Sequence, residues 1–484
     1  MQTRNEPSLL WFCLGIVMLS ALVCVVFLVF FLGKGKRPEK AFPFLALGFG
    51  LCFLFAITPL SVPDELTHYK ASYELSNHLT RRENPNEANG ADFDFTGFSA
   101  HKNTSLGYGV LASDFFSETR HEEPIQIEGL SEVYTLQFFA EYLPQAIGIV
   151  IARLLDLNFL QTFYLGRCTN LLFYILCLGV AIKKIPYFKT TLGVIGTLPM
   201  ALQQAASFSY DSYINGLAFV LTAGILKACC DDGPLSRRDY LIMLGCSMML
   251  APAKGTYSFL ILLYLLIPAN RFASKKEKRL SFLGILIGCG MVFLITAYPA
   301  MTRILNSSTG AHNSVSVREL FSVELLRSIT RIHNTLNKLL SDLIEGAIGR
   351  ALSGLSLRIP GWMIWVEIVA IILSVLDKES SCGPVTEKMR VMFLLISVLV
   401  FFSFIFAMLL SWSDKALPYI AGLQGRYLIP VLPLLFMSIN NRTLVLKRNL
   451  DMQISTIHAV TEVCVLLYIV DLTTAPLGVA TLLA

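Results

Sequence analysis

Long apolar runs alternate with short polar segments along almost the whole chain. An α-helix needs about 20 apolar residues to cross the hydrocarbon core of a membrane, and runs of this kind recur throughout the sequence. The pattern predicts about twelve membrane-spanning helices, over residues 8–32, 42–60, 160–183, 190–206, 212–228, 239–253, 256–270, 280–300, 361–377, 390–412, 426–440 and 455–476. We therefore expect an all-α, multi-pass membrane protein.

Composition agrees with this expectation. Hydrophobic residues make up 54% of the 484 positions and charged residues only 15%, with a mean hydropathy of +0.61. The first apolar run, 8–32, is too long for the core of a signal peptide and lacks a small-x-small cleavage site, so we expect a retained helix. The 11 cysteines show no metal-type spacing, and no glycine-rich phosphate loop is present. We predict neither a disulfide framework nor a soluble cofactor domain.

Charge is distributed in short basic runs between the helices rather than in one patch. The net charge is only +5, so nucleic acid is not an expected partner. The positive-inside rule places the basic segments in the cytoplasm, namely Lys34–Lys40, Lys183–Lys189, Arg237–Arg238, Arg271–Arg279, Lys378–Arg390 and Arg442–Arg448. All of them share one side only if residues 143–157 form an interfacial helix instead of crossing. Both termini then face outward.

Two large polar segments, 61–141 and 301–360, then lie outside the cell. The second contains an amphipathic stretch, Ile332–Leu357, with Leu336, Leu339, Leu340, Leu343 and Ile344 on one helical face. Such a helix lies either in the membrane surface or against the rest of its own loop. We divide the chain into an extra N-terminal helix with its basic loop, 1–40, and a main membrane domain, 41–484.

Adjacent carboxylates, Asp64 and Glu65, follow Pro63 where an early apolar run ends. Acidic residues so close to lipid are costly, which makes them candidates for function. One of them is positioned to act as a general base. The alternative is helix capping, because an aspartate at the start of a helix accepts bonds from free backbone N–H groups. Either residue can cap while the other stays free.

His68 and Tyr69 follow on the helix expected over Asp64–Arg81. Asp64 and His68 are four residues apart and therefore share a face, where they can share a proton or a metal ion. Asp64, Glu65 and His68 are the only candidate ligands of a divalent metal, and they are too few to predict one. A polar helix face at an interface is the simpler explanation of His68 and Tyr69.

Three further polar segments interrupt the apolar runs on the outer side. Tyr210 and Asp211 lie in Ser-Phe-Ser-Tyr-Asp-Ser, which is also a good turn sequence. Lys254 and Tyr257 lie in Pro-Ala-Lys-Gly-Thr-Tyr, where the lysine either binds a phosphate or reaches the lipid headgroups. Gln424, Arg426 and Tyr427 lie in Gly-Leu-Gln-Gly-Arg-Tyr. Arginine holds phosphate through two hydrogen bonds, although a headgroup or Asp414 is an alternative partner.

The expected interfacial helix begins with Glu141, Tyr142, Pro144 and Gln145. These residues either line a lipid entrance or pack against neighbouring helices. With these, the chain carries in order Pro-Asp-Glu-x-x-His, Tyr-x-Pro-Gln-Ala, Ser-Tyr-Asp, Ala-Lys-Gly-x-Tyr and Gln-Gly-Arg-Tyr-x-x-Pro. Over about residues 42–440 this set resembles the bacterial membrane-protein family known as domain of unknown function 2142. That family is similar to the GT-C glycosyltransferases.

The resemblance implies a GT-C-like helix bundle in a bacterial plasma membrane, with its site on the extracytoplasmic side. It implies an inverting transfer from a polyprenyl-phosphate sugar to a glycan or lipid-linked acceptor. Asp64 or Glu65 would be the base, and Lys254 and Arg426 would hold the donor phosphate. We expect His68, Tyr69, Tyr210, Asp211, Tyr257, Gln424 and Tyr427 to line the substrate site. The N-terminal helix 8–32 departs from the usual GT-C start.

Two other functions compete with this interpretation. A transporter or flippase of a lipid-linked saccharide would use charged residues as a path through the middle of the bundle, and transporters often show inverted repeats, which this sequence lacks. A non-catalytic scaffold of envelope polysaccharide synthesis would need the Asp-Glu pair only for capping.

Overall fold

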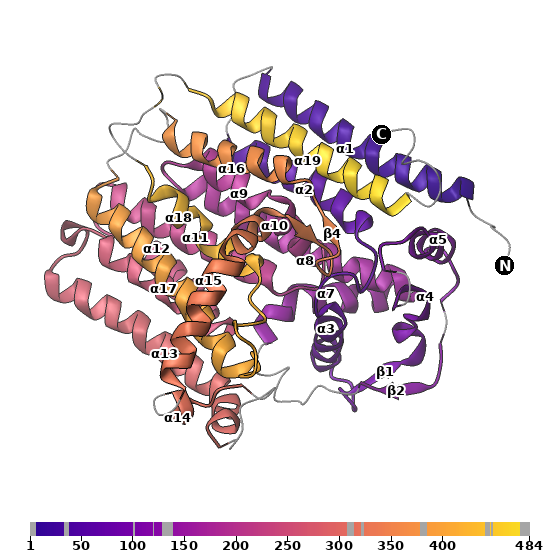
Figure 1. Ribbon diagram of the computed structural model, residues 1–484, viewed down its shortest axis with the longest axis horizontal. Coiled ribbons are helices and arrows are strands. Elements are labelled where there is room, and N and C mark those ends of the chain that lie inside the picture. Colours follow the sequence, from indigo (N-terminus) through magenta and orange to yellow (C-terminus); the bar gives the residue numbers. More distant parts are fainter. Residues whose placement is uncertain are drawn as a thin grey trace.

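The computed structural model describes residues 6–32, 38–99, 102–119, 121–127, 139–306, 314–320, 324–377, 385–440, 446 and 449–474. It is built almost entirely of helices, as the apolar pattern predicts (Figure 1). The long helices are α1 (Glu6–Leu32), α2 (Pro38–Ala56), α8 (Phe159–Lys184), α11 (Asp211–Cys230), α12 (Arg237–Ala253), α13 (Lys275–Asn306), α16 (Gly361–Leu376), α17 (Glu387–Ser411) and α19 (Asp451–Thr474).

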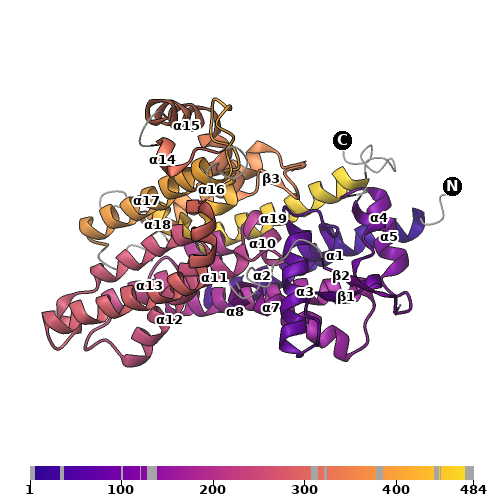
Figure 2. The ribbon, with the colours of Figure 1, turned by 90° about the horizontal axis from the view of Figure 1, so that it is seen from below.

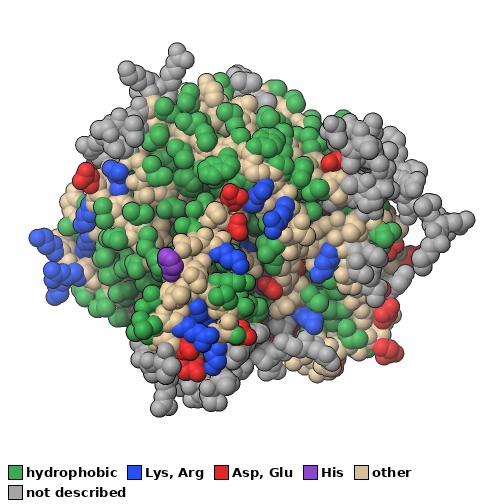
Figure 3. All heavy atoms as spheres, viewed as in Figure 1, with side chains coloured by type: hydrophobic (Ala, Val, Ile, Leu, Met, Phe, Trp, Pro, Cys, Tyr) green, Lys and Arg blue, Asp and Glu red, His purple; other side chains and the backbone are tan. Residues whose placement is uncertain are grey.

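Among the described residues, six helices are long and apolar enough to cross a membrane: α2, α8, α11, α13, α17 and α19. Shorter apolar segments include α16 and the described core of α1, Gly15–Phe27. The figure of about twelve spans stays a prediction, because several expected spans are shorter or broken. Broad hydrophobic surface separates small groups of charged side chains on one face of the molecule, as a lipid-exposed bundle requires (Figure 3).

Three expected spans are not single α-helices. Residues 190–206 form α9 (Lys189–Gly196) and α10 (Pro199–Ala205), which are separated where Pro199 starts a new helix. Residues 256–270 begin as the 3₁₀-helix η2 (Gly255–Leu266), and a short 3₁₀ turn, η3 (Ala269–Arg271), follows. Residues 426–440 form the 3₁₀-helix η5 (Gly425–Val431) and α18 (Leu432–Met437). Proline removes a backbone donor and clashes with the preceding turn, so helices restart at these positions.

Helix α8 lies inside the bundle, where it packs against α2, α11 and α7 (Phe139–Leu154). On one side, α19 packs against α1, α2 and α16, so that the last helix lies beside the first (Figures 1 and 2). On the other side, α12 packs against α11, α13 and η2. The chain therefore closes on itself, with sequence-distant helices in contact.

The first polar segment forms a small cap at one end of the bundle (Figures 1 and 2). It contains α3 (Glu65–Leu79), η1 (Gly90–Phe93), α4 (Thr96–Ser99), α5 (Ser105–Asp114) and the antiparallel pair β1 (Glu87–Asn89) and β2 (Pro124–Gln126). Helix α3 packs along α7. It agrees with the helix expected from Asp64, and the chain after it is irregular apart from these short elements.

The second polar segment contains α14 (Val317–Leu320), α15 (Leu325–Ile348) and the short hairpin β3 (Ala351–Leu352) and β4 (Leu357–Arg358). The amphipathic helix was expected to reach Leu357, but α15 ends at Gly349, whose φ of 141° does not continue a helix. Its expected apolar face is divided, because Leu343 is buried while Leu340 is exposed. Packing against η5 accounts for the buried half.

Ion pairs connect the ends of three basic loops. Lys189 Nζ lies 3.5 Å from Glu39 Oε2, and Lys184 Nζ lies 3.0 Å from Asp239 Oδ1. Loops 34–40 and 183–189 therefore share one end of the bundle. The start of α2, the end of α8 and the start of α12 thus lie close together, which is the arrangement expected if the segment over 143–157 does not cross. The interfacial position of that segment stays a prediction.

Candidate functional site

Asp64 sits in an unusual backbone conformation at the turn between α2 and α3. Its φ and ψ of 61° and 10° are left-handed, and its side chain makes no capping hydrogen bond. The side chain is 64% exposed and lies 3.5 Å from Arg426 Nη2. Left-handed residues other than glycine cost energy and concentrate at functional sites. The capping alternative is therefore wrong for Asp64, whose carboxylate projects outward beside an arginine.

Glu65 points the other way, into the protein. Its two carboxylate oxygens accept hydrogen bonds from Arg167 Nε at 2.9 Å and Arg167 Nη2 at 2.8 Å, and both side chains are fully buried. The backbone N–H of Phe208 donates to the same carboxylate. Arg167 also donates to the carbonyls of Leu54, Ile57 and Thr58 at the end of α2. A carboxylate held in this way is poorly placed to accept a substrate proton, which argues against Glu65 as the base.

Arg167 is the partner that the sequence analysis missed. It lies in α8, 102 residues from Glu65. An arginine inside an otherwise apolar helix needs a partner, and that was the available signal. The pair fixes α3 to α8 and to the last turn of α2, and so orients the turn that presents Asp64.

Asp211 connects the two cations predicted to hold phosphate. Its Oδ1 lies 2.6 Å from Lys254 Nζ, and its Oδ2 lies 3.3 Å from Arg426 Nε. The aspartate is at the start of α11, the lysine follows α12 and the arginine is in η5. Four expected site residues, Asp64, Asp211, Lys254 and Arg426, thus meet in one charged cluster.

Aromatic rings surround this cluster. Lys254 Nζ lies 4.4 Å from the ring centre of Tyr427 and 5.0 Å from that of Tyr210. Such contacts stabilise a partly desolvated ammonium. The Tyr257 hydroxyl donates to the backbone carbonyl of Tyr427 at 2.9 Å, which fixes η5 against η2. Tyr257 is therefore behind the cluster rather than facing a ligand.

His68 adjoins the same cluster but does not pair with Asp64. Its Nδ1 lies 3.0 Å from the Tyr142 hydroxyl, and its ring meets Tyr210 edge-on at 5.0 Å. Burial and then the nearby Arg426 guanidinium lower the pKa of His68 to about 4. The imidazole is therefore neutral at neutral pH. Because Glu65 turns toward Arg167, the three candidate metal ligands Asp64, Glu65 and His68 do not converge.

Glu141 is buried beside the cluster, on α7. Burial raises the pKa of its carboxyl to about 8, against the opposing effect of Lys254 and with a smaller contribution from Asp211. The group is mostly protonated at neutral pH. The sequence offered Glu141 as lining of a lipid entrance or as a packing residue, and the structure buries it next to the charged residues.

Tyr69 was expected in the site, but in the structure it lies away from the charged cluster. Its ring packs with Phe93, Phe95, Phe163 and Phe208. Its hydroxyl donates to the Asp92 carbonyl. Tyr69 is one residue after His68, so it faces a different side of α3 and fills the core of the cap.

A cavity of about 280 Å³ adjoins the cluster between α10, α15, the β3–β4 hairpin and η5. Arg426, Gln424 and Pro63 line one wall, and Arg350 and Arg358 line another. The sequence analysis missed the last two arginines, which lie in the second polar segment. The lining also includes the acidic residues Asp342 and Glu345, and Arg350 Nε lies 3.4 Å from Glu345 Oε2. Three arginines against two carboxylates leave one positive charge, which suits an anionic ligand because guanidinium groups bind phosphate and carboxylate in a bidentate fashion.

Comparison with known proteins identifies a family for this chain but gives no activity. No curated protein and no solved structure matches the chain significantly. The model of one family, described as "Predicted membrane protein (DUF2142)", matches residues 47–435. The matched region contains every residue of the charged cluster. The chain therefore belongs to the DUF2142 family of membrane proteins.

Proposed function

We propose that the protein is an inverting membrane glycosyltransferase that uses a polyprenyl-phosphate sugar as donor. The observation that carries the proposal is the convergence of Asp64 with Arg426, Lys254 and Asp211 at the edge of a cavity whose lining has three arginines and two acidic residues. An exposed carboxylate next to clustered cations is what transfer from a phosphate-linked sugar needs.

In the proposed step, the acceptor hydroxyl oxygen attacks the anomeric carbon of the donor sugar. The bond from that carbon to the phosphate oxygen breaks, and its electron pair leaves with polyprenyl phosphate. The hydroxyl proton passes to Asp64, which is the only exposed carboxylate of the cluster among the described residues. General base catalysis of this kind contributes about 10²–10⁴-fold to a rate.

The cluster holds two cations against two carboxylates, since Asp211 contacts both Lys254 and Arg426 and Asp64 contacts Arg426. Protonation of Asp64 in the proposed step would leave one positive charge in excess to face the phosphate. Arg426 is 6% exposed, and its Nη1 makes no hydrogen bond within the described residues. A donor phosphate would accept from this nitrogen and from Lys254. The two cations would also stabilise the second negative charge that develops as phosphate leaves.

We place this chemistry on the extracytoplasmic face of a bacterial plasma membrane. The basic loop ends lie together at one end of the bundle, and the positive-inside rule assigns such an end to the cytoplasm. The cap formed by α3, α4 and α5 lies away from them (Figure 2). An acceptor on the outer face, either a glycan or a lipid-linked saccharide, would reach Asp64 from that side.

The test compares envelope glycans of a deletion strain complemented with wild type, Asp64→Asn or Glu123→Gln. Asparagine tolerates the left-handed conformation at this position, so the backbone is preserved. Glu123 is an exposed glutamate of the same cap and serves as control. We expect loss of one sugar in the deletion strain, restored by wild type and Glu123→Gln but not by Asp64→Asn at equal membrane abundance.

Full restoration by Asp64→Asn would reject Asp64 as the base. If the deletion strain kept every envelope sugar under conditions that express the gene, the glycosyltransferase proposal itself would be wrong. If the protein is a scaffold, the deletion strain should lose the glycan, and the Asp64→Asn variant should restore it.

One observation favours transport as a second candidate. Glu367, His458 and Glu462 are buried ionisable groups where α16 packs on α19, of the kind that the path of a coupling ion uses. If the protein is a flippase, a deletion strain should accumulate its lipid-linked saccharide on the cytoplasmic side. No type of sugar should then be lost from the lipid pool. Analysis of lipid-linked saccharides in the deletion strain separates the two functions.

A further inference from the structure

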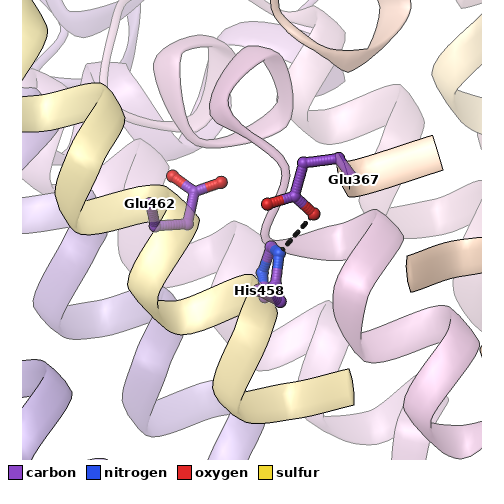
Figure 4. Close-up of side chains that lie close together, drawn as sticks. All are labelled: Glu367, His458 and Glu462. Carbon is purple, nitrogen blue, oxygen red and sulfur yellow. Dashed lines mark hydrogen bonds and ion pairs between the residues drawn. The ribbon is translucent and has the colours of Figure 1, made fainter. Parts of the chain in front are cut away.

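Three ionisable side chains meet where α16 packs on α19, away from the charged cluster. Glu367 comes from α16, and His458 and Glu462 lie one turn apart on α19 (Figure 4). Each is at most 1% exposed. One ligand atom from each residue lies within 4.8 Å of the others. Among the described residues, this is the only group of three such side chains placed to hold a metal ion.

Hydrogen bonds around His458 determine which ring nitrogen faces the carboxylates. The Thr197 hydroxyl lies 2.7 Å from His458 Nε2 and also donates to the Gly193 carbonyl at 2.7 Å. With its hydrogen on the Gly193 carbonyl, the hydroxyl accepts a hydrogen bond from His458 Nε2–H. In the neutral ring this leaves Nδ1 with a lone pair, as in metal-binding histidines whose other nitrogen is held by a neighbour.

His458 Nδ1 lies 2.7 Å from Glu367 Oε2. In this tautomer a proton or a cation must lie between the two atoms. Glu367 Oε1 and both oxygens of Glu462 are buried and make no hydrogen bond within the described residues. No lysine or arginine in the described part of the chain forms an ion pair with either glutamate. Two buried carboxylates without a cation are very costly in a membrane.

We propose that Glu367, His458 and Glu462 bind one divalent transition-metal ion of the Zn²⁺ type. Two carboxylates and a neutral imidazole balance the charge of a divalent cation and suit Zn²⁺ or Mn²⁺, whereas Ca²⁺ and Mg²⁺ prefer oxygen ligands alone. The site is closed to solvent, which is typical of structural metals. The proposal does not depend on the proposed function.

The position of the site indicates what the ion does. The family match ends at residue 435, so α16 lies within it and α19 lies beyond it. Helix α19 in turn contacts α1, the other helix outside the match. The metal would therefore fasten the two terminal helices to the family core. Its loss would weaken that attachment without touching Asp64 or Arg426.

The test is elemental analysis of the full-length protein in detergent, with melting temperatures before and after chelation. We expect about one Zn²⁺ or Mn²⁺ per wild-type chain, a lower melting temperature after chelation, and recovery on adding back the ion found. Glu462→Gln should lose the metal, and Glu462→His, which supplies another ligand, should retain it. Glu141→Gln removes a buried glutamate elsewhere and should keep full metal content.

Thr197→Val tests the orienting hydrogen bond, and we expect metal affinity to fall about 10–100-fold. If wild type neither contains nor takes up either ion, and chelator does not change its melting temperature, the cluster holds a proton and the metal proposal is wrong. Equal metal content in wild type and a folded Glu462→Gln variant would also overturn it.

Discussion

Asp64 and Glu65 are adjacent and both acidic, yet one is exposed and the other is buried. Asp64 is left-handed, exposed and beside Arg426, while Glu65 starts α3 and is buried against Arg167. A sequence shows only two adjacent carboxylates, so it cannot say which faces solvent. The decisive information is Arg167, which reaches Glu65 from α8. Substitution of Glu65 should therefore impair the fold, whereas substitution of Asp64 should impair only the proposed activity.

Glu65→Gln should destabilise the fold, whereas Asp64→Asn should not. Removing one partner of a buried pair leaves the other charge uncompensated, at a cost of about 3–5 kcal/mol. An exposed substitution such as Asp64→Asn should change stability by less than about 0.5 kcal/mol. Thermal unfolding of the purified proteins checks this. Equal melting temperatures for Glu65→Gln and wild type would show that the pair is not needed for stability.

Glu141 should make stability depend on pH. Burial raises its pKa from 4.5 to about 8, so the folded protein binds a proton more tightly than the unfolded chain. This contribution is complete below pH 4.5 and is lost as pH rises toward 8 and beyond. Glutamine is neutral at every pH. The melting temperature of Glu141→Gln relative to wild type should therefore be higher at pH 9 than at pH 5, and a difference independent of pH would contradict the assignment.

At the scale of elements, apolar length predicted where helices lie but not where they break. Residues 190–206 read as one span, yet Pro199 begins a separate helix, α10. The sequence contained the signal, since proline favours the first turn of a helix. Whether a proline kinks a span or divides it depends on packing with neighbours. Here α10 contacts α15 and η5, which no local pattern reveals.

The contact between α15 and η5 has no space for an added side chain at Gly425. A Cβ there would lie 2.5 Å from the Leu343 carbonyl oxygen. Since this is backbone, Gly425→Ala must displace α15 or η5, and with it Arg426. We expect a loss of about 1–3 kcal/mol of stability and loss of glycan restoration.

Gly109→Ala in α5, where nothing lies within 4 Å of the added carbon, is the matched control. Melting temperature and glycan complementation measure both variants. If the two alanine variants behaved alike, the close approach of α15 and η5 would not matter for the site.

On the scale of the whole molecule, the charge pattern predicts sidedness, and the ion pairs bring together the start of α2, the end of α8 and the start of α12, which that pattern assigns to one side. Glu122 in the cap and Arg238 at the start of α12 should lie on opposite sides of the membrane. A membrane-impermeant thiol reagent should label Glu122→Cys in intact cells and Arg238→Cys only after permeabilisation, each compared with wild type. Labelling of both from outside would mean that α7 crosses and that the topology is wrong.

The candidate site could be predicted in its parts but not in its assembly. Most of its charged residues stand out as polar breaks in apolar sequence, where Asp211, Lys254 and Arg426 were expected to act. Their mutual contacts depend on helix packing, and the adjoining Arg350 and Arg358 lie in a loop with no distinguishing pattern. Tyr69 was misplaced because one residue along a helix changes the face by a quarter turn or more.

Asp64 and Arg426 are 362 residues apart along the chain. The ribosome therefore makes Asp64 early and Arg426 only after most helices have been delivered to the membrane. Until then Asp211 has Lys254 as its sole cationic partner within the cluster. The cluster is therefore completed as one of the final events of biogenesis, and a chain released before Arg426 lacks the contacts of Arg426 with Asp64 and Asp211.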